Sequence, residues 1–251
     1  MKAKATFFIA LALVASACGS NDPAASDSIT VFAAASLTEA FTQIASDFEE
    51  QEAIEVRLSF GPSDGLATQI QEGAPADVFA SASPKWMDAV AEDPGVTRRT
   101  DFTRNILVVI LPIDDPADID RVEDLQRPGI KLVLAAEGVP AGDYAREMLA
   151  NAGIADEALA NVVSNEDDVK GVVQKVALGE ADAGIVYRTD VTSAVAGDLQ
   201  VVEVPDDINV VAVYPIAAVE RGEGNVIARE FVAYVLGPGQ SVLEEAGFLP
   251  P

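Results

Sequence analysis

The chain contains no histidine and a single cysteine among its 251 residues. Without an imidazole or a second thiol it cannot form a Ser-His-Asp or Cys-His catalytic centre, most kinds of zinc site or an internal disulfide. An enzyme would need a pair of carboxylates for acid–base chemistry, and no pair of the abundant acidic residues stands out by its spacing. Because runs of Asp and Glu are usually solvated surface, we predict that the protein is not an enzyme.

Basic residues are also scarce, since 16 Lys and Arg stand against 41 Asp and Glu and give a formal charge of −25. Such a surface suits neither nucleic acid nor an anionic membrane, because both are bound through basic patches. The acidic stretch 114–124 lacks the ligand spacing of an EF-hand loop, so we interpret it as a solvated face that holds no metal ion. Any site for an anion must rely on local dipoles rather than on net charge.

The N-terminus has the pattern of a secretory signal. Lys2 and Lys4 precede an apolar segment, residues 7–14, that is too short to span a bilayer. Residues 13–19 resemble a bacterial lipobox, with Ala15 where Leu is usual, and Cys18 would then carry lipid; the alternative is a plain signal peptide with an incidental cysteine. We predict a signal peptide over 1–17, and the lipidated Cys18 with a flexible tether over 18–28. The protein would be exported and held at the outer face of the cell membrane or in the periplasm by its lipid anchor only.

Residues 29–41 set the organisation of the rest of the chain. The first half is a β-branched and apolar run typical of a buried strand. The second half opens a helix, with an apolar stripe from Leu37 to Phe48 at a 3.6-residue period. Ser36 lies between them as the expected N-cap, so the strand points at a helix N-terminus, where free N–H groups and the helix dipole favour an anion. Because Ser36 and Glu39 also form a capping box, Ser36 is interpreted as a cap, a ligand-binding residue or both.

The same alternation of strand and helix continues along the chain. Strands are predicted over residues 54–60, 77–81, 105–111, 131–135, 183–187 and 209–219, and helices follow from residues 66, 84, 141, 169 and 225. This order predicts an α/β fold with parallel strands, and its lengths suit two lobes. Ligands of such sheets bind where strands end and helices begin, and Ser36, Ser63 and Ala141 lie at three of these junctions.

Several blocks, in order along the chain, resemble the molybdate-binding proteins of bacterial molybdate ABC importers. The resemblance extends from Ile29 to Phe248. The blocks are VFAAASLTEA (31–40), GAPADVFASA (73–82), KWMD (85–88), VPAGDYA (139–145), DVK (168–170) and GIVY (184–187).

This resemblance implies a two-lobe periplasmic-binding-protein fold of type II. Each lobe would be a mixed, mostly parallel sheet flanked by helices, with the ligand cleft between the lobes. Lobe I would comprise residues 29–106 and 209–251, and lobe II residues 107–208.

The resemblance also implies a function and a site. The protein would be a monomeric receptor that captures molybdate or tungstate and delivers it to an ABC permease, without a cofactor or a bound metal cation. The family's ligand donors correspond here to the Ser36 and Ser63 hydroxyls, the Ala141 and Val169 backbone N–H groups, and the Tyr187 hydroxyl. A dianion offers only acceptors, so neutral donors suit it without a buried counter-charge. By its own position, Tyr187 also fits an aromatic residue on the surface at a strand end.

Two departures from the family pattern lie near the expected site. Where the family has a run of small residues around Ser63, this chain has Pro62, which has no N–H to donate, and Asp64, which brings a carboxylate close. Glu39 does the same at the first helix. These residues leave open an alternative, in which the same fold binds a different oxyanion or a small carboxylate.

Overall fold

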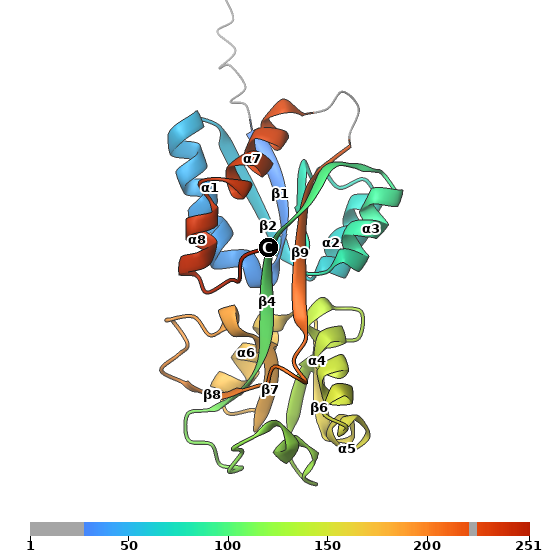
Figure 1. Cartoon of the computed structure of the whole chain (residues 1–251), viewed down its shortest axis with the longest axis vertical. Coiled ribbons are helices and arrows are strands. Elements are labelled where there is room, and N and C mark those ends of the chain that lie inside the picture. The colour runs from blue at the N-terminus through green and yellow to red at the C-terminus, as the bar shows by residue number, and fades with distance from the viewer. Residues whose placement is uncertain (1–27, 221–224) are drawn as a thin grey trace, which may run out of the picture.

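The computed structural model describes residues 28–220 and 225–251, and within them it forms one nine-stranded mixed sheet flanked by helices (Figure 1). This confirms the predicted α/β fold class. Strand β1 (Ser28–Ala34) runs through a short 3-10 turn (Ala35–Leu37) into helix α1 (Thr38–Glu52). The predicted apolar stripe is the buried face of α1, from Ala40 to Phe48. The predicted leader, the lipid site at Cys18 and the tether lie outside the described residues.

The upper half of the molecule in Figure 1 is built around β1. Strand β1 pairs in parallel with β2 (Glu55–Gly61) and β3 (Val78–Ala80), which places the ends of all three strands at one edge. The helices of this half, besides α1, are α2 (Ser63–Gln71), α3 (Pro84–Glu92), α7 (Val226–Leu236) and α8 (Gln240–Glu245).

The lower half repeats the arrangement around β5 (Leu132–Ala135). This strand pairs in parallel with β6 (Val162–Glu166) and β7 (Ala183–Tyr187). The other elements of this half are the 3-10 turns Val122–Gln126 and Arg188–Asp190, the helices α4 (Pro140–Asn151), α5 (Ala155–Ala160) and α6 (Val169–Ala177), and strand β8 (Leu199–Glu203).

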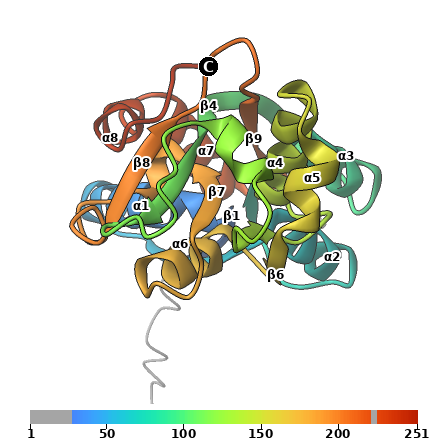
Figure 2. The same cartoon turned by 90° about the horizontal axis from the view of Figure 1, so that it is seen from below.

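Two long antiparallel strands join the halves. Strand β4 (Val96–Pro112) pairs with β9 (Val211–Val219) from Val96 to Ile106, and then with β7 and β8 from Leu107 onward. Antiparallel pairing therefore lies in the middle of the sheet and parallel pairing in its two outer parts. Seen from below, α1, α6 and α8 lie on one side of the strands and α2 to α5 on the other (Figure 2).

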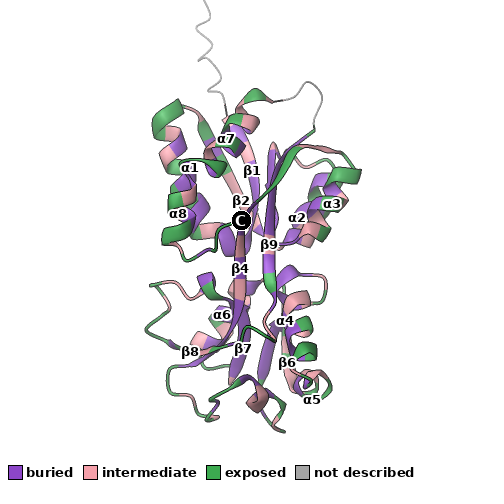
Figure 3. Ribbon diagram, in the orientation of Figure 1, coloured by how far each residue is buried: buried purple, intermediate pink, exposed green. Residues whose placement is uncertain are grey.

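The core follows the strands and the inner faces of the helices, while the outer helix faces are exposed (Figure 3). In the upper half it contains edge-to-face aromatic contacts, such as Phe41 with Phe102 and Phe48 with Phe231. The sequence predicted the buried strands but missed β6, β8, α5, α8 and the first part of β4. These elements are short or half-exposed, so their hydrophobic pattern is weak.

The start of α4 requires a glycine. A Cβ on Gly142 would collide with the backbone carbonyl groups of Ala135 and Ala136, with the Ala135 carbonyl carbon only 2.8 Å away. The absence of a side chain therefore lets the first turn of α4 lie directly against the end of β5.

We expect Gly142→Ala to lower the free energy of unfolding by about 1–3 kcal/mol, the usual cost of overpacking, although Ala is the better helix former. Gly197→Ala is the matched control, because a Cβ there meets nothing within 4 Å. Denaturant unfolding of both variants checks this. Equal stability of the two variants would show that α4 does not depend on the close approach.

Candidate functional site

A small cavity lies where the two halves meet, and all five residues predicted to bind a ligand line it. Its volume is about 20 Å³, above the roughly 10–15 Å³ that one water molecule requires, so it suits a ligand of a few atoms. The upper half contributes Ala34, Ala35, Ser36, Gly61, Pro62, Ser63 and Ala82, and the lower half contributes Val139, Pro140, Ala141, Asp168, Val169 and Tyr187.

Three helices begin at this cavity. Helix α2 starts at Ser63, α4 at Pro140 and α6 at Val169. The first N–H groups of a helix have no acceptor within the helix and lie at the positive end of its dipole. The Ala141 N–H precedes the first intrahelical bond of α4, which Asp143 N makes to Val139 O. Backbone donors from both halves therefore surround one small space.

Ser36 does not cap the first helix, so this interpretation was wrong. Helix α1 begins only at Thr38, after the 3-10 turn, and has Leu37 at its N-cap without a side-chain capping bond. The extra turn moves Ser36 away from the helix end. Its Oγ lies 2.9 Å from the Tyr214 hydroxyl, and either oxygen can be the donor. Ser36 is buried beside the cavity.

No described residue accepts the Ser63 hydroxyl proton, which can therefore be donated to a ligand. Its Oγ accepts the N–H of Ala82 at 3.0 Å, and this bond uses a lone pair rather than the hydroxyl proton. Ser63 is 1% exposed, so its remaining hydrogen-bonding capacity is directed into the protein interior and the cavity that it lines.

Tyr187 is buried, which excludes the alternative of an aromatic residue on the surface. Its ring packs edge-to-face on Tyr214, with 5.8 Å between the ring centroids. Within the described part of the chain, its hydroxyl has no hydrogen-bond partner. Burial raises its pKa well above the ordinary value, so the phenol stays protonated. A buried donor without an acceptor costs free energy. A ligand in the cavity that accepts a hydrogen bond from the Tyr187 hydroxyl would remove this cost.

The cavity carries little formal charge. Among the described residues, Asp168 is the one acidic side chain that lines it and no Lys or Arg does so. The Asp168 carboxylate caps α6 by accepting the Gly171 N–H at 3.0 Å. Of the two departures noted near Ser63, Pro62 lines the cavity, whereas Asp64 is not a lining residue. The Glu39 carboxylate lies 2.9 Å from Lys170 Nζ and is not a lining residue either.

A buried carboxylate that the sequence did not reveal lies behind Tyr187. Asp190 is 1% exposed, and its Oδ2 accepts the Tyr187 N–H at 3.2 Å. Its Oδ1 lies 3.5 Å from Lys170 Nζ, which also binds Glu39. Burial raises the pKa of Asp190 to about 7, against the attraction of Lys170. The sequence held no signal for Tyr214, because its partner Ser36 lies 178 positions away. Asp190 accepts a local N–H three residues back, but its burial beside Lys170 of α6 depends on the tertiary packing.

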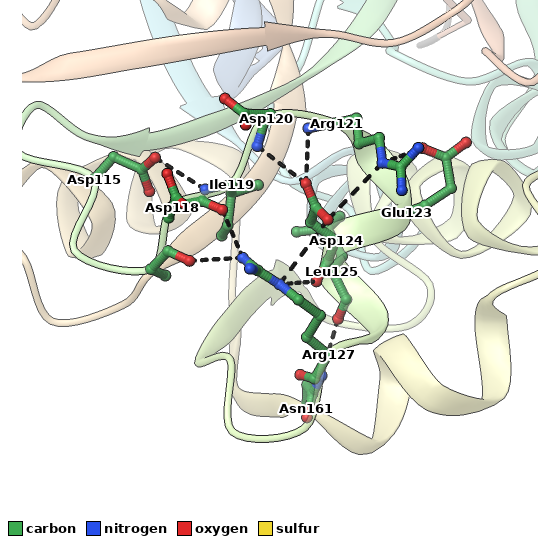
Figure 4. A network of polar contacts seen from close by, with 11 residues as sticks. Asp115, Asp118, Ile119, Asp120, Arg121, Glu123, Asp124, Leu125, Arg127 and Asn161 are labelled. Atoms are coloured by element: carbon green, nitrogen blue, oxygen red, sulfur yellow. Dashed lines mark hydrogen bonds and ion pairs between the residues drawn. The ribbon is translucent and has the colours of Figure 1, made fainter.

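The acidic segment 114–124 uses its side chains to hold its own loop (Figure 4). Asp115 accepts the N–H of Ile119, and Asp124 accepts those of Asp120 and Arg121. Arg127 donates to the backbone oxygens of Ala117 and Asp118. In the described ranges, no group of three acidic, Cys or His side chains could hold a metal ion. Nor is any helix there long and apolar enough to cross a membrane.

Comparisons with known proteins agree with the resemblance found in the sequence. The family model for bacterial extracellular solute-binding proteins matches residues 29–249. The molybdate-binding protein ModA of Mycobacterium tuberculosis is 41% identical over 246 residues, which cover 94% of this chain and 92% of the relative. ModA of Escherichia coli is 38% identical over 230 residues, with 88% of each chain covered. The structure of the periplasmic molybdate-binding protein of Azotobacter vinelandii has a TM-score of 0.78 at 21% identity, covers 89% of this chain and 99% of its own, and shows the same fold.

The raised pKa of Asp190 predicts a pH-dependent stability. Between the pKa near 3.9 of an unfolded Asp and the folded pKa of about 7, the folded state holds the additional proton. The free energy of unfolding therefore falls as pH rises through this window. Asp190→Asn should remove this loss. As the pH rises from 4 to 8, we expect the free energy of unfolding of the variant to increase by about 4 kcal/mol relative to that of wild type.

Denaturant unfolding over this pH range checks the expectation, with the exposed Asp207 changed to Asn as the control. The same pH dependence in wild type and Asp190→Asn would contradict it.

Proposed function

The chain belongs to the family of bacterial extracellular solute-binding proteins, and from this we propose that it is a receptor that captures molybdate or tungstate between its two halves and delivers it to an ABC permease. The observation that carries the proposal is the buried Tyr187 hydroxyl, which has no hydrogen-bond partner among the described residues and lines a cavity of other hydrogen-bond donors. The relatives named as molybdate-binding proteins support the choice of ligand.

The proposed ligand contacts are neutral donors. They are the hydroxyls of Ser36, Ser63 and Tyr187 and the backbone N–H groups of Ala141 and Val169. A tetrahedral dianion has only acceptors, so every one of these groups can donate to it. When Ser36 donates to the anion, the Tyr214 hydroxyl must donate to Ser36 Oγ, which fixes the direction of that bond. The anion thus replaces its hydration shell without a buried cation, whose desolvation would be costly.

Size is the proposed basis for choosing among anions. Sulfate is also a tetrahedral dianion, so charge and hydrogen-bonding capacity do not separate it from molybdate. Donors fixed for the larger ion lie too far from the oxygens of the smaller one, and hydrogen bonds weaken with distance. Pro62 is the one lining residue that departs from the family pattern. The relatives named as molybdate-binding proteins favour molybdate over a different oxyanion or a small carboxylate.

The remaining parts of the proposal concern the whole protein. We place it outside the cytoplasm, at the outer face of the membrane or in the periplasm, anchored through Cys18 and acting as a monomer without catalytic activity. Its lobes would be residues 29–106 with 209–251, and residues 107–208. In support of this division, β4 exchanges β9 for β7 and β8 between Ile106 and Leu107.

A calorimetric titration of the chain without its signal peptide tests the ligand. We expect 1:1 binding of molybdate that persists in excess sulfate, because donors spaced for the larger ion would lie too far from the sulfate oxygens. Absence of heat with molybdate, or equal competition by sulfate, would assign this site to a different ligand.

Two substitutions test the site. Ser36→Ala and Tyr187→Phe each remove one hydrogen bond to a charged ligand, and we expect each to weaken molybdate binding by about 1–3 kcal/mol. Ser241→Ala and Tyr234→Phe are the matched controls, because neither residue lines the cavity. Unchanged affinity in both test variants, measured by the same titration, would refute the assignment of these residues.

A further inference from the structure

The two halves are joined across the cleft by a bond that lies outside the cavity. Trp86, on α3 of the upper half, donates its indole N–H to the Gly138 carbonyl at 2.9 Å. Gly138 lies in the turn before α4 of the lower half, so this bond connects the two halves, to which α3 and α4 belong (Figure 1). Neither Trp86 nor Gly138 lines the cavity.

Side chains around this bond hold the Gly138 turn in place. The Gly138 N–H donates to Asp143 Oδ1 at 2.7 Å, which ties the turn to the first turn of α4. The other carboxylate oxygen of Asp143 lies 3.2 Å from Lys85 Nζ, and this ammonium group lies 4.7 Å from the centre of the Trp86 ring. Four residues, Lys85, Trp86, Gly138 and Asp143, therefore form a closed ring of contacts, which we call the clasp.

The bonds of the clasp differ in strength. The side chains of Lys85 and Asp143 are 58% and 33% exposed, and an ion pair so exposed contributes little. The Trp86 bond is partly buried. When it breaks, the Gly138 carbonyl and the indole N–H must form hydrogen bonds with water instead, so the cost is that of one net hydrogen bond. Trp86 should therefore contribute most of the effect of the clasp.

The clasp acts on the segment that carries a proposed ligand donor. Gly138 is followed by Val139, Pro140 and Ala141, which all line the cavity. A movement that brings the Ala141 N–H to the anion also brings the Gly138 carbonyl to Trp86. The opposite rim has its own contact between the halves, from Lys170 on α6 to Glu39 on α1.

We propose that Trp86 is a positioning residue, whose bond to Gly138 holds the cleft closed and slows the escape of an oxyanion that it does not touch. The inference rests on the proposed function. The apparent affinity of a receptor equals its intrinsic affinity multiplied by the fraction of molecules in the closed, binding-competent form. A bond that exists only in the closed form therefore raises affinity, and does so mainly by lowering the dissociation rate.

The test compares wild type with Trp86→Phe, which keeps an aromatic ring but removes the N–H. Affinity is measured by titration with sodium molybdate, and dissociation by chasing isotope-labelled molybdate with unlabelled molybdate. We expect the dissociation rate to rise about 3- to 10-fold, the equivalent of one net hydrogen bond. The association rate should not change, because the open form lacks the bond. The melting temperature of the ligand-free protein should fall only through the smaller ring, because Trp86 also packs against a hydrophobic cluster of the upper half.

Lys85→Met is a second variant, and we expect it to increase the dissociation rate by less than Trp86→Phe does. Its matched control is Lys175→Met, because Lys175 pairs with Glu166 inside the lower half and does not cross the cleft. This control should leave both rates unchanged. An effect of Lys175→Met as large as that of Trp86→Phe would overturn the clasp.

A measurement on the wild type covers the case in which Trp86→Phe does not fold. The chain has one tryptophan, so its indole N–H gives a single NMR signal, whose hydrogen exchange should slow when molybdate is added. Two results would overturn the clasp alone. One is tight molybdate binding with unchanged hydrogen exchange of the indole N–H, and the other is an unchanged molybdate dissociation rate in a folded Trp86→Phe variant. Absence of molybdate binding by the wild type would overturn the proposed function and the clasp with it.

Discussion

The site depends on the backbone N–H groups at the starts of α2, α4 and α6, which have no acceptor within their own helices. Parallel strands place their following helices at one edge of a sheet, and each half of this protein presents such an edge to the other. Donors that are enclosed without an acceptor cost free energy. The cavity therefore favours a ligand that only accepts hydrogen bonds, and the buried Tyr187 hydroxyl adds one more donor.

The protein is strongly acidic, yet three carboxylates near the site have partners within the protein. Glu39 pairs with Lys170, Asp168 accepts an N–H at the start of α6, and Asp190 lies behind Tyr187 with its Oδ2 on a backbone N–H. Each of the three therefore has a hydrogen-bond or ion-pair partner within the protein. The donors of the site act at contact distance, so they can hold an anion in spite of the net charge of −25, which repels one.

Two kinds of bond connect the halves, backbone pairing within the sheet and side-chain contacts. Strands β4 and β9 join the halves through backbone pairing within the sheet. The contacts across the cleft, from Trp86 to Gly138 and from Lys170 to Glu39, involve side chains and lie outside the cavity or at its rim. Side-chain bonds can open without disrupting the sheet, whereas moving β4 from β9 would break backbone pairing.

The sequence by itself determined the alternation of strands and helices, the buried face of α1, the exclusion of histidine and thiol chemistry, and the resemblance to a family. These features are encoded in residue types and in spacings of two to four residues. The half-exposed strands β6 and β8 gave no such periodic signal. The tertiary structure decided that Ser36 lies against Tyr214, 178 positions later in the chain, rather than capping a helix. It also decided that Lys170 of α6 lies beside Asp190 and that Trp86 reaches Gly138. Such contacts depend on how distant elements pack and how the halves close, and no local pattern encodes either.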